Sequence, residues 1–558
     1  LTFLLPPNPS DMVLQAAGIV ASYFGDAGRR HGIKIEARYG GLDAGNVVVF
    51  RSGGAGPQGL NFDGPASQNA ISIQGNPRDA GASKLLIVSG ADDAGLVQAA
   101  QHLALGGRGH ALSGPAVTVG GAPTMLERQP DDASRWIPLD RPVTLGEFVK
   151  RAENLQGVGP SGFISAPFVM PPRKLPDEQG GPRLRLEYDY PDMQFLDTTT
   201  SRFDVLLSDK FIKSLPLKPA EAIDKLAGIF KGPMDEEARS VVRIDPSVIV
   251  TPRNELQFFF DMKPIKQEEC KGKLPVDMRF RIQPSSTLDF SDTIHYTPLP
   301  DVSYFASVGY PFTRMADLSE TVVMLPANPD QNEVSAYLNI MALAGEATGD
   351  PATRVVVARP GGLGAHPDKD VLAIGAWQNL QAALQTWQGG GAFQFKDGSL
   401  RISSVSPIES MRYFFSGGAD QSAERERADA ILASQGQNFS GLVSFERPDA
   451  SGRTVVMVAG GSPAATLELV ERMRDPELRD SFKGDLVRMD VAGVTSFAVG
   501  PQFTVYSIPF WQRLRWYFAD RPLLLIALLV IGVAFLSMIL IWLLQRISAA
   551  RANDAHQE

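Results

Sequence analysis

The chain has 558 residues, a formal net charge of −9, 44% apolar residues and 21% charged residues. This composition excludes a disordered chain, and the length predicts three or four folded domains. The acidic balance argues against a general nucleic-acid-binding protein, and the single cysteine, Cys270, excludes an intrachain disulfide. The six histidines show no metal-ligand spacing, so we expect neither a metal site nor a cofactor.

An internal duplication organises the chain. The segment LLPPNP at 4–9 recurs as MLPANP at 324–329, and ARYGGLDA at 37–44 recurs as ARPGGLGA at 358–365, at a nearly constant offset. A third pair, LLIVSG near residue 85 and VVMVAG near residue 455, has a longer offset. The second copy is therefore predicted to carry an insertion of about 50 residues between Gly375 and Thr454.

Each copy is predicted to run strand, helix, strand, strand, helix, strand, which implies a parallel sheet with helices on both faces. We therefore expect two flavodoxin-like α/β domains, at 1–124 and 304–505. Asn8 and Asn328 are the expected helix N-caps. The first turn of each copy is rich in proline and has no glycine, so it offers few backbone N–H groups to a phosphate. These domains are predicted to be scaffolds, not nucleotide-binding enzymes.

The middle of the chain, 125–303, is predicted to be a jelly-roll β-sandwich. Residues 183–190 alternate polar and apolar side chains, and 203–217 is predicted to form a hairpin with its turn at Ser208-Asp209. Jelly rolls often bind carbohydrate, with aromatic rings packed on the apolar faces of sugars. The candidate glycan contacts are Trp136, Phe168, Tyr188 and Tyr190. Tyr188 and Tyr190 share one strand face, and the pattern leaves open whether that face is core or solvent.

The membrane end of the chain starts at about residue 506. Residues 523–544 contain no charged side chain and would form a helix of about 33 Å, enough to cross a hydrocarbon core of about 30 Å. We expect a transmembrane anchor at 522–545 and a polar tail at 546–558. The preceding segment, 506–521, is predicted to be an amphipathic helix in the membrane interface, with aromatic residues on one face and arginines on the other. The interface candidates are Phe510, Trp511, Arg513, Leu514, Arg515, Trp516, Tyr517 and Phe518. Arginines flank the span on both sides, so charge alone leaves its orientation open.

Two short motifs raise an enzymatic alternative. Residues 512–516, QRLRW, fit the Q-x-x-R-W motif of processive β-glycosyltransferases, and Asp368-Lys369-Asp370 supplies a D-x-D pair. However, the sequence has no T-E-D base motif, and one span cannot build the translocation pore of those enzymes. We therefore expect no catalysis. A membrane-tethered enzyme acting on cell-wall polysaccharide is the alternative, and a structural scaffold that touches no sugar is a third hypothesis.

The segment GYPFTRMADLSETVVMLP at 309–326 resembles a signature of the cyclic-di-GMP-associated periplasmic subunits of bacterial cellulose synthase. The order of parts agrees over essentially the whole chain, although that family normally begins with a signal peptide and a further carbohydrate-binding-like module. The resemblance implies a non-catalytic, single-pass subunit of the cell inner membrane with its soluble part in the periplasm. Its implied partners are the multispanning catalytic cellulose synthase subunit, the secreted β-1,4-glucan that it guides, and the lipid bilayer. It also implies that cyclic di-GMP binds the catalytic partner, and this sequence has no R-x-x-x-R arrangement followed by the D-x-S-x-x-G strand that would bind it.

Overall fold

The computed structural model divides the chain into two compact units. The first comprises Leu1–Val405 and Asp420–Val505, and the second comprises Ser406–Ala419 and Tyr506–Glu558. The residues that the structure describes are 1–53, 68–106, 114–175, 181–190, 196–197, 199–217, 241–264, 278–293, 295–380, 393–396, 399–403, 422–490, 493–506, 511 and 522–554.

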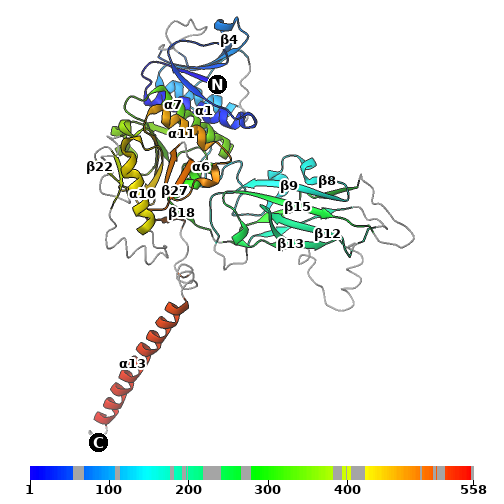
Figure 1. Cartoon of the computed structure of the whole chain (residues 1–558), viewed down its shortest axis with the longest axis vertical. Helices are drawn as coiled ribbons and strands as arrows, with labels where there is room; N and C mark the ends of the chain where they lie inside the picture. Colours follow the sequence, from blue (N-terminus) through cyan, green and yellow to red (C-terminus); the bar gives the residue numbers. More distant parts are fainter. Residues whose placement is uncertain are drawn as a thin grey trace. The chain divides into compact units, whose positions relative to one another are not determined.

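The first unit opens with a six-stranded mixed sheet in the order β2-β1-β3-β5-β4-β6 (Figure 1). The four strands β2, β1, β3 and β5 are parallel, whereas β4 and β6 join one edge antiparallel. The strands are β1 (Thr2–Leu5), β2 (Glu36–Tyr39), β3 (Val47–Ser52), β4 (Ala70–Gly75), β5 (Lys84–Gly90) and β6 (Ala116–Thr118). The predicted order has two strands between its two helices, whereas the structure has four, β2 to β5.

The second α/β sheet repeats this arrangement, in the order β20-β19-β21-β25-β24-β26-β27. Again four parallel strands are followed by an antiparallel edge. The strands are β19 (Thr321–Met324), β20 (Val356–Ala358), β21 (Asp370–Ala376), β24 (Gly441–Glu446), β25 (Thr454–Gly460), β26 (Leu486–Asp490) and β27 (Gly493–Phe497). The matching order confirms the internal duplication.

The predicted insertion in the second copy is also confirmed. Between β21 and β24 the chain adds β22 (Phe393–Lys396), β23 (Ser399–Ile402) and α10 (Ser422–Gln435), which have no counterpart between β3 and β4 among the described residues. Ala428 and Leu432 of α10 are buried in an apolar cluster with Val322 and Met324 of β19. The insertion therefore covers one face of the second sheet.

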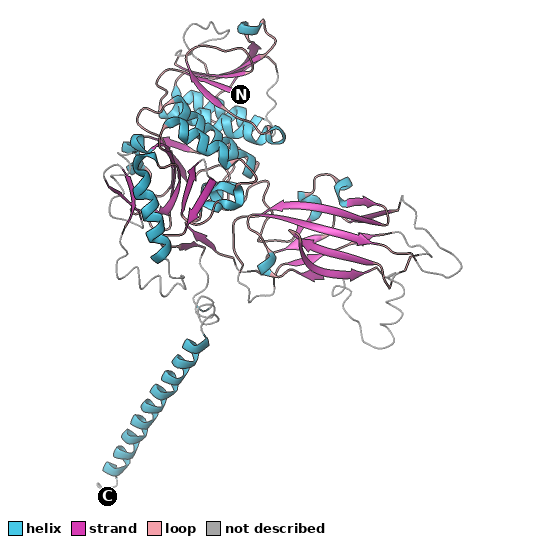
Figure 2. Ribbon diagram, in the orientation of Figure 1, coloured by secondary structure: helices cyan, strands magenta, loops and turns pink. Residues whose placement is uncertain are grey.

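Four helices pack on the other faces of the two sheets (Figure 2). They are α1 (Asp11–Ala27), α2 (Asp93–Gly106), α7 (Gln331–Thr348) and α11 (Pro463–Met473), and they share one apolar core with both sheets. Helix α1 contacts α2, and both helices pack in the same apolar core. The two described helices of the first copy therefore lie on one face of its sheet. The expectation of helices on both faces thus holds for the second sheet and is wrong for the described part of the first.

The helix caps differ from the prediction. The N-cap of α1 is Ser10, whose hydroxyl accepts from the Val13 N–H, and the N-cap of α7 is Asp330, which forms a capping box with Glu333. Asn8 instead adopts a left-handed φ of 54°, which asparagine tolerates in turns. The predicted caps, Asn8 and Asn328, were therefore two residues too early in both copies.

The β-rich region consists of three sheets around one apolar core. Their orders are β14-β10-β17-β7, β11-β16-β8 and β13-β12-β15-β9. The strands are β7 (Val143–Thr144), β8 (Gln156–Val158), β9 (Ser161–Val169), β10 (Arg183–Arg185), β11 (Tyr188–Asp189), β12 (Arg202–Leu207), β13 (Lys210–Pro216), β14 (Val241–Arg243), β15 (Arg253–Asp261), β16 (Arg279–Ile282) and β17 (Thr287–Asp289). In β9 and β15 buried and accessible residues alternate, so one face of their sheet is core and the other faces solvent.

The first unit also contains a small sheet of β18 (Thr297–Leu299) and β28 (Phe503–Val505), followed in the chain after β18 by α6 (Val302–Val308). In the second unit the main described element is α13 (Pro522–Asp554). Its segment Leu529–Ile547 has a mean hydropathy of 2.1, and none of that segment is buried. By length and composition this helix could cross a membrane.

Candidate functional site

Trp136 and Phe168, two of the predicted glycan contacts, are buried. Only 6% of Trp136 and 4% of Phe168 is exposed, although both residues line an open groove of about 1380 Å³. The indole N–H of Trp136 donates to the carbonyl of Ala347 at 3.2 Å. Both rings belong to apolar clusters, so neither presents a free face on which a sugar could stack.

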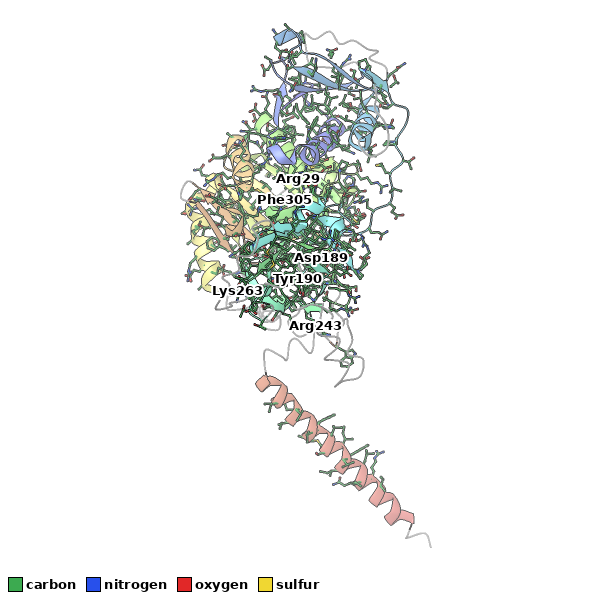
Figure 3. All side chains as sticks on the ribbon, turned by 90° about the vertical axis from the view of Figure 1, so that its right-hand side faces the viewer. Arg29, Asp189, Tyr190, Arg243, Lys263 and Phe305 are labelled. Carbon is green, nitrogen blue, oxygen red and sulfur yellow. The ribbon has the colours of Figure 1, made fainter. Side chains whose placement is uncertain are left out.

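Tyr188 and Tyr190, the other two candidates, are stacked with ring centroids 6.2 Å apart (Figure 3 labels Tyr190). Tyr188 also contacts Phe203 at 4.6 Å, and burial raises the pKa of its phenol. Both tyrosines pack against the core of the β-rich region and keep part of their surface exposed. The shared strand face therefore lies at the margin of the core.

The solvent face of the sheet β13-β12-β15-β9 carries aromatic residues that the sequence analysis missed. Phe163 of β9 is 64% exposed and lies opposite Phe259 of β15, with ring centroids 4.6 Å apart. Phe211 of β13 is 61% exposed and lies opposite Leu206 of β12 on the same face. With strands about 4.8 Å apart, the two exposed rings are about 15 Å from each other across the sheet. We call this surface the Phe163 face.

A strip of polar side chains lies beside these rings on the same face. Gln257 stands opposite Ser165 in the strand register, and Ser165 donates to the carboxylate of Glu255. The side-chain amide of Gln257 donates to Asp209 at 2.9 Å, and its carbonyl accepts from the Asp209 N–H at 3.1 Å. Carboxylate and amide groups of this kind can exchange hydrogen bonds with sugar hydroxyls, while the rings supply apolar contact.

The turn that positions Asp209 confirms the predicted hairpin. Ser208 and Asp209 have φ values of 48° and 65°, as a two-residue type I′ connection between β12 and β13 requires. Neither residue is glycine, so this backbone costs energy that the two Gln257 hydrogen bonds offset. Backbone strain thus lies next to the polar strip.

A signal for the Phe163 face was present in the sequence. Phe258 and Phe260 point into the core, as the alternation in β15 demands, whereas Phe259 occupies a position where a polar residue is expected. An aromatic residue at a position of the strand that faces solvent indicates either a second packed layer or a binding surface. What the sequence could not supply was the register that places Phe163 opposite Phe259.

The D-x-D pair of the enzymatic alternative is divided by the fold. Asp370 is buried, accepts from the Thr454 N–H at 2.6 Å and lies 3.5 Å from Arg453, whereas Asp368 is exposed. Burial raises the pKa of Asp370, since the arginines nearby compensate only in part. The two carboxylates therefore do not form the paired metal ligand that the motif suggested, and no metal-binding group of three acidic, histidine or cysteine residues occurs in the described part of the chain.

Most of the predicted interface helix lies outside the described residues, namely Phe510, Arg513, Leu514, Arg515, Trp516, Tyr517 and Phe518. The same holds for the Q-x-x-R-W motif. The remaining candidate, Trp511, is described and is 75% exposed.

Comparison with known protein families finds three matches that follow one another along the chain. They are "Cellulose synthase BcsB, first FD domain" at residues 1–119, "Cellulose synthase BcsB, second CBM domain" at 142–287 and "Cellulose synthase BcsB, second FD domain" at 295–458. Each match falls on one of the three folded regions described above.

Curated relatives match nearly the whole chain. A cyclic di-GMP-binding protein of Pseudomonas fluorescens (strain SBW25) is 30% identical over 564 residues, which is 99% of this chain and 73% of the relative. A protein of the same name from Escherichia coli (strain K12) is 30% identical over 561 residues, 97% of this chain and 69% of the relative. Cellulose synthase 2 of Novacetimonas hansenii is 29% identical over 556 residues, 98% of this chain and 34% of that longer relative.

Proposed function

Because the chain belongs to the BcsB family of cellulose synthase subunits, we propose that it is a non-catalytic, membrane-anchored subunit of a bacterial cellulose synthase complex. In this role it supports the catalytic subunit and guides the secreted β-1,4-glucan. The observation that carries the proposal is the identity of 30% over 99% of the chain to a relative of the same family.

The match to Cellulose synthase 2 supports a separate catalytic partner. This chain corresponds to 34% of that relative, so most of the longer protein has no counterpart here. If the catalytic part of such a protein lies in the remainder, then this chain acts beside a synthase encoded as another polypeptide. The buried Asp370 argues in the same direction, because it removes the D-x-D pair on which the enzymatic alternative depended.

The Phe163 face is the surface that we propose for the glucan. Exposed rings attract the apolar faces of pyranose units, and the strip of Ser165, Glu255, Gln257 and Asp209 offers partners for their hydroxyls. Phe163 and Phe211, about 15 Å apart, could contact different units of one extended chain. Tyr188 and Tyr190 remain secondary candidates, because each keeps only part of its surface exposed.

We propose that α13 is a single transmembrane anchor and that 506–521 forms the interfacial helix, with the large soluble part in the periplasm. The length and hydropathy of α13 support the span. The guanidinium of Arg546 lies 4.6 Å from the ring centre of Trp542, a pairing suited to the boundary between lipid and water. We infer the periplasmic side for the soluble part from the membership of the family.

The finer domain description is likewise our proposal. We assign a flavodoxin-like fold to 1–124 and 304–505, and a jelly-roll fold to 125–303. The family matches support these limits to within some twenty residues at the starts of the β-rich and second α/β regions. The segment 522–545 would be the anchor and 546–558 its polar tail.

Cyclic di-GMP is part of the names of several relatives. For this chain we propose that the nucleotide binds the catalytic partner, because the R-x-x-x-R arrangement at 239–243 is not followed by a D-x-S-x-x-G strand. Calorimetric titration of the purified chain with cyclic di-GMP tests this directly. Micromolar binding by the chain alone would overturn this part of the proposal.

The subunit assignment is tested by purification and reconstitution. A tagged full-length chain is expected to co-purify with a multispanning glycosyltransferase, and the chain alone is expected to show no turnover of UDP-glucose. Proteoliposomes that contain both proteins are expected to make glucan, whereas proteoliposomes with either protein alone are not. Turnover by the isolated chain would favour the enzymatic alternative.

A further inference from the structure

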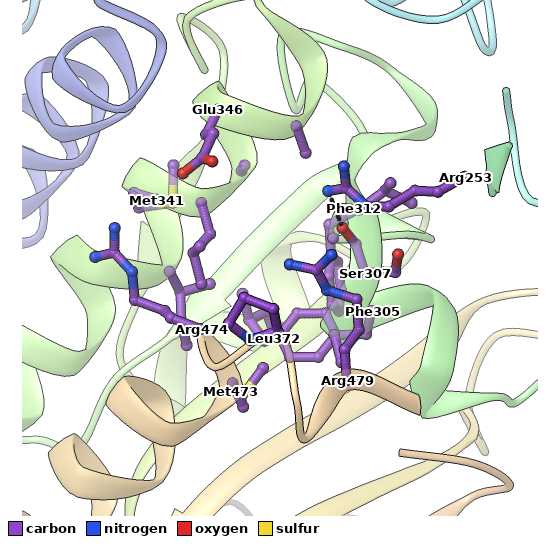
Figure 4. Close-up of a pocket in the computed structure, with 18 of the residues that line it drawn as sticks. Arg253, Phe305, Ser307, Phe312, Met341, Glu346, Leu372, Met473, Arg474 and Arg479 are labelled. Carbon is purple, nitrogen blue, oxygen red and sulfur yellow. Dashed lines mark hydrogen bonds between the residues drawn. The ribbon is translucent and has the colours of Figure 1, made fainter. Parts of the chain in front are cut away.

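A cavity of about 250 Å³ lies between α6, α7 and the segment that follows α11 (Figure 4). It includes none of the aromatic and polar residues named for the Phe163 face, although Arg253 lies on the same face of β15. Its inner surface is apolar and almost completely shielded from solvent, with each of these residues at most 4% exposed: Phe305, Phe312, Leu318, Leu372 and Met473. Such a surface favours an apolar group over water.

The rim of the same cavity is cationic. Arg253, Arg474 and Arg479 line it together with one acidic residue, Glu346. Figure 4 shows Arg253 and Arg479 on one side of the cavity, with Arg474 and Glu346 on the other. Within the described part of the chain, none of the three arginines lies within ion-pair distance of a carboxylate. Glu346 and Glu471 therefore act on these arginines only at longer range, and the lining of the cavity keeps an excess of positive charge.

Two of these arginines have structural contacts that fix them in place. Arg253 donates to the carbonyl of Ser307 at 3.0 Å, and Arg474 donates to the carbonyl of Ile33 and, at 3.3 Å, to the side-chain oxygen of Asn339. Burial lowers the pKa of both guanidinium groups, and the neighbouring Arg479 lowers the pKa of Arg253 further. Both side chains still have N–H groups to offer, because a guanidinium has five.

Arg479 supplies an independent sign of a missing partner. Its Nε atom is buried and has no hydrogen-bond acceptor among the described residues. A buried charged donor without an acceptor is costly, by more than a neutral one. Two guanidinium groups side by side, one of them unsatisfied, form a site for an oxyanion, which can accept from both in the fork geometry that arginine prefers.

We propose that this cavity binds a small organic anion whose phosphate or carboxylate lies between Arg253 and Arg479 and whose apolar body fills the cavity. The volume limits the body to roughly the size of one aromatic ring or a short acyl chain. Glu346 repels a second anionic group, so a ligand with one charged end fits better than a polyphosphate. Because Arg253 comes from the β-rich region and Arg479 from the second α/β region, the ligand would tie these two regions together.

The test uses the full chain in detergent and three probes: phenyl phosphate, inorganic phosphate and phenol. Saturation-transfer NMR is expected to show transfer of saturation from the protein to the ring protons of phenyl phosphate, since the ring contacts the apolar inner surface of the cavity. Competition titrations are expected to rank phenyl phosphate at least tenfold tighter than inorganic phosphate or phenol. Equal weak binding of all three probes, or no transfer at millimolar phenyl phosphate, would overturn the proposal.

Variants locate the site. Arg479→Met and Arg253→Met keep the length of the side chain and remove the charge, and each is expected to weaken phenyl phosphate binding about tenfold or more. Arg479→Lys keeps the charge without the fork and is expected to recover part of the affinity. Arg243→Met, at an exposed position on β14, is the matched control and is expected to bind like the unmodified chain. If the two Met variants at the rim also bind like the unmodified chain, the anion site is not this cavity.

Discussion

The hydroxyl of Tyr337 in α7 donates a hydrogen bond to the carbonyl of Leu14 in α1, 3.1 Å away and fully buried. The two residues come from different copies of the internal repeat, so this bond joins the duplicated α/β domains. It is possible because Gly18 leaves room: a Cβ at Gly18 would lie 1.9 Å from the Tyr337 hydroxyl. The two first helices of the repeats thus pack against each other at glycine positions.

The close approach of α1 and α7 predicts a strong effect of Gly25→Ala. A Cβ at Gly25 would lie 1.9 Å from the backbone carbonyl of Ala342, which cannot move aside as a side chain can. The better helix propensity of alanine contributes about 1 kcal/mol, but the forced separation of the helices costs about 1–3 kcal/mol or more. We expect a net loss of unfolding free energy, measured by denaturant titration. The control is Gly361→Ala, where no atom lies within 4 Å, and its stability should change by less than about 0.5 kcal/mol.

The Phe163 face predicts a selective loss of glycan binding. Phe163→Ala is expected to reduce cello-oligosaccharide binding several-fold, because a stacked ring contributes about 1 kcal/mol or more. The change should leave stability nearly intact, since 64% of the side chain is already exposed. Binding is measured by calorimetry on the full chain in detergent. Leu126→Ala is the control, since Leu126 is 82% exposed and lies outside the strands; equal binding by both variants would contradict the assignment.

Tyr188 and Tyr190 allow a second comparison on the same assay. Tyr190→Ala should reduce oligosaccharide binding only if the glycan also contacts the strand face that carries Tyr188 and Tyr190. Tyr188→Ala is expected to lower stability by a few kcal/mol, because its ring packs against Phe203 and Phe260. A thermal melt recorded beside each titration separates these two effects. Unchanged binding for Tyr190→Ala together with a loss for Phe163→Ala would confine the contact to the Phe163 face.

His295 predicts a dependence of stability on pH. Burial, with Arg173 nearby, lowers its pKa from 6.5 to about 4. Above pH 6.5 the ring is neutral in both states; between pH 6.5 and 4 only the unfolded chain takes up the proton. The unfolding free energy should therefore fall as the pH drops through this range, by a few kcal/mol at most. His295→Gln removes this titration, so the difference in stability between the two chains should vary with pH from 6.5 to 4. A constant difference would contradict the shift.

The proposed anchor predicts that one charge in α13 weakens membrane association. Leu536→Arg places a guanidinium within the apolar segment, at a cost of about 3 kcal/mol for a spanning helix. Flotation of the full chain with liposomes is expected to show a larger unbound fraction than for the unmodified protein. Leu126→Arg adds the same charge to an exposed site in the first unit and serves as control. If both variants float alike, α13 does not hold the chain in the bilayer.

Much of the architecture could be predicted because it depends on local patterns. The repeat, its insertion and the Ser208-Asp209 turn follow from residue order, and all three are present in the structure. The helix caps were misplaced because several residues in each turn are good caps, and only the backbone direction at Asn8 selects Ser10. The antiparallel strand β4 was missed because short exposed strands carry a weak pattern.

The sequence by itself determined the two duplicated α/β regions, the β-rich middle, the apolar C-terminal helix and the family. Each of these features depends on periodicity, composition or a contiguous motif. Only the tertiary structure decided which aromatic residues meet solvent. Trp136 and Phe168 are enclosed by segments distant in the chain, whereas Phe163 and Phe211 lie on an open sheet face. It also brought Arg253 and Arg479 to one cavity. The burial of a side chain and the residues around it depend on contacts between segments that are remote in the chain. A local sequence pattern does not contain those contacts.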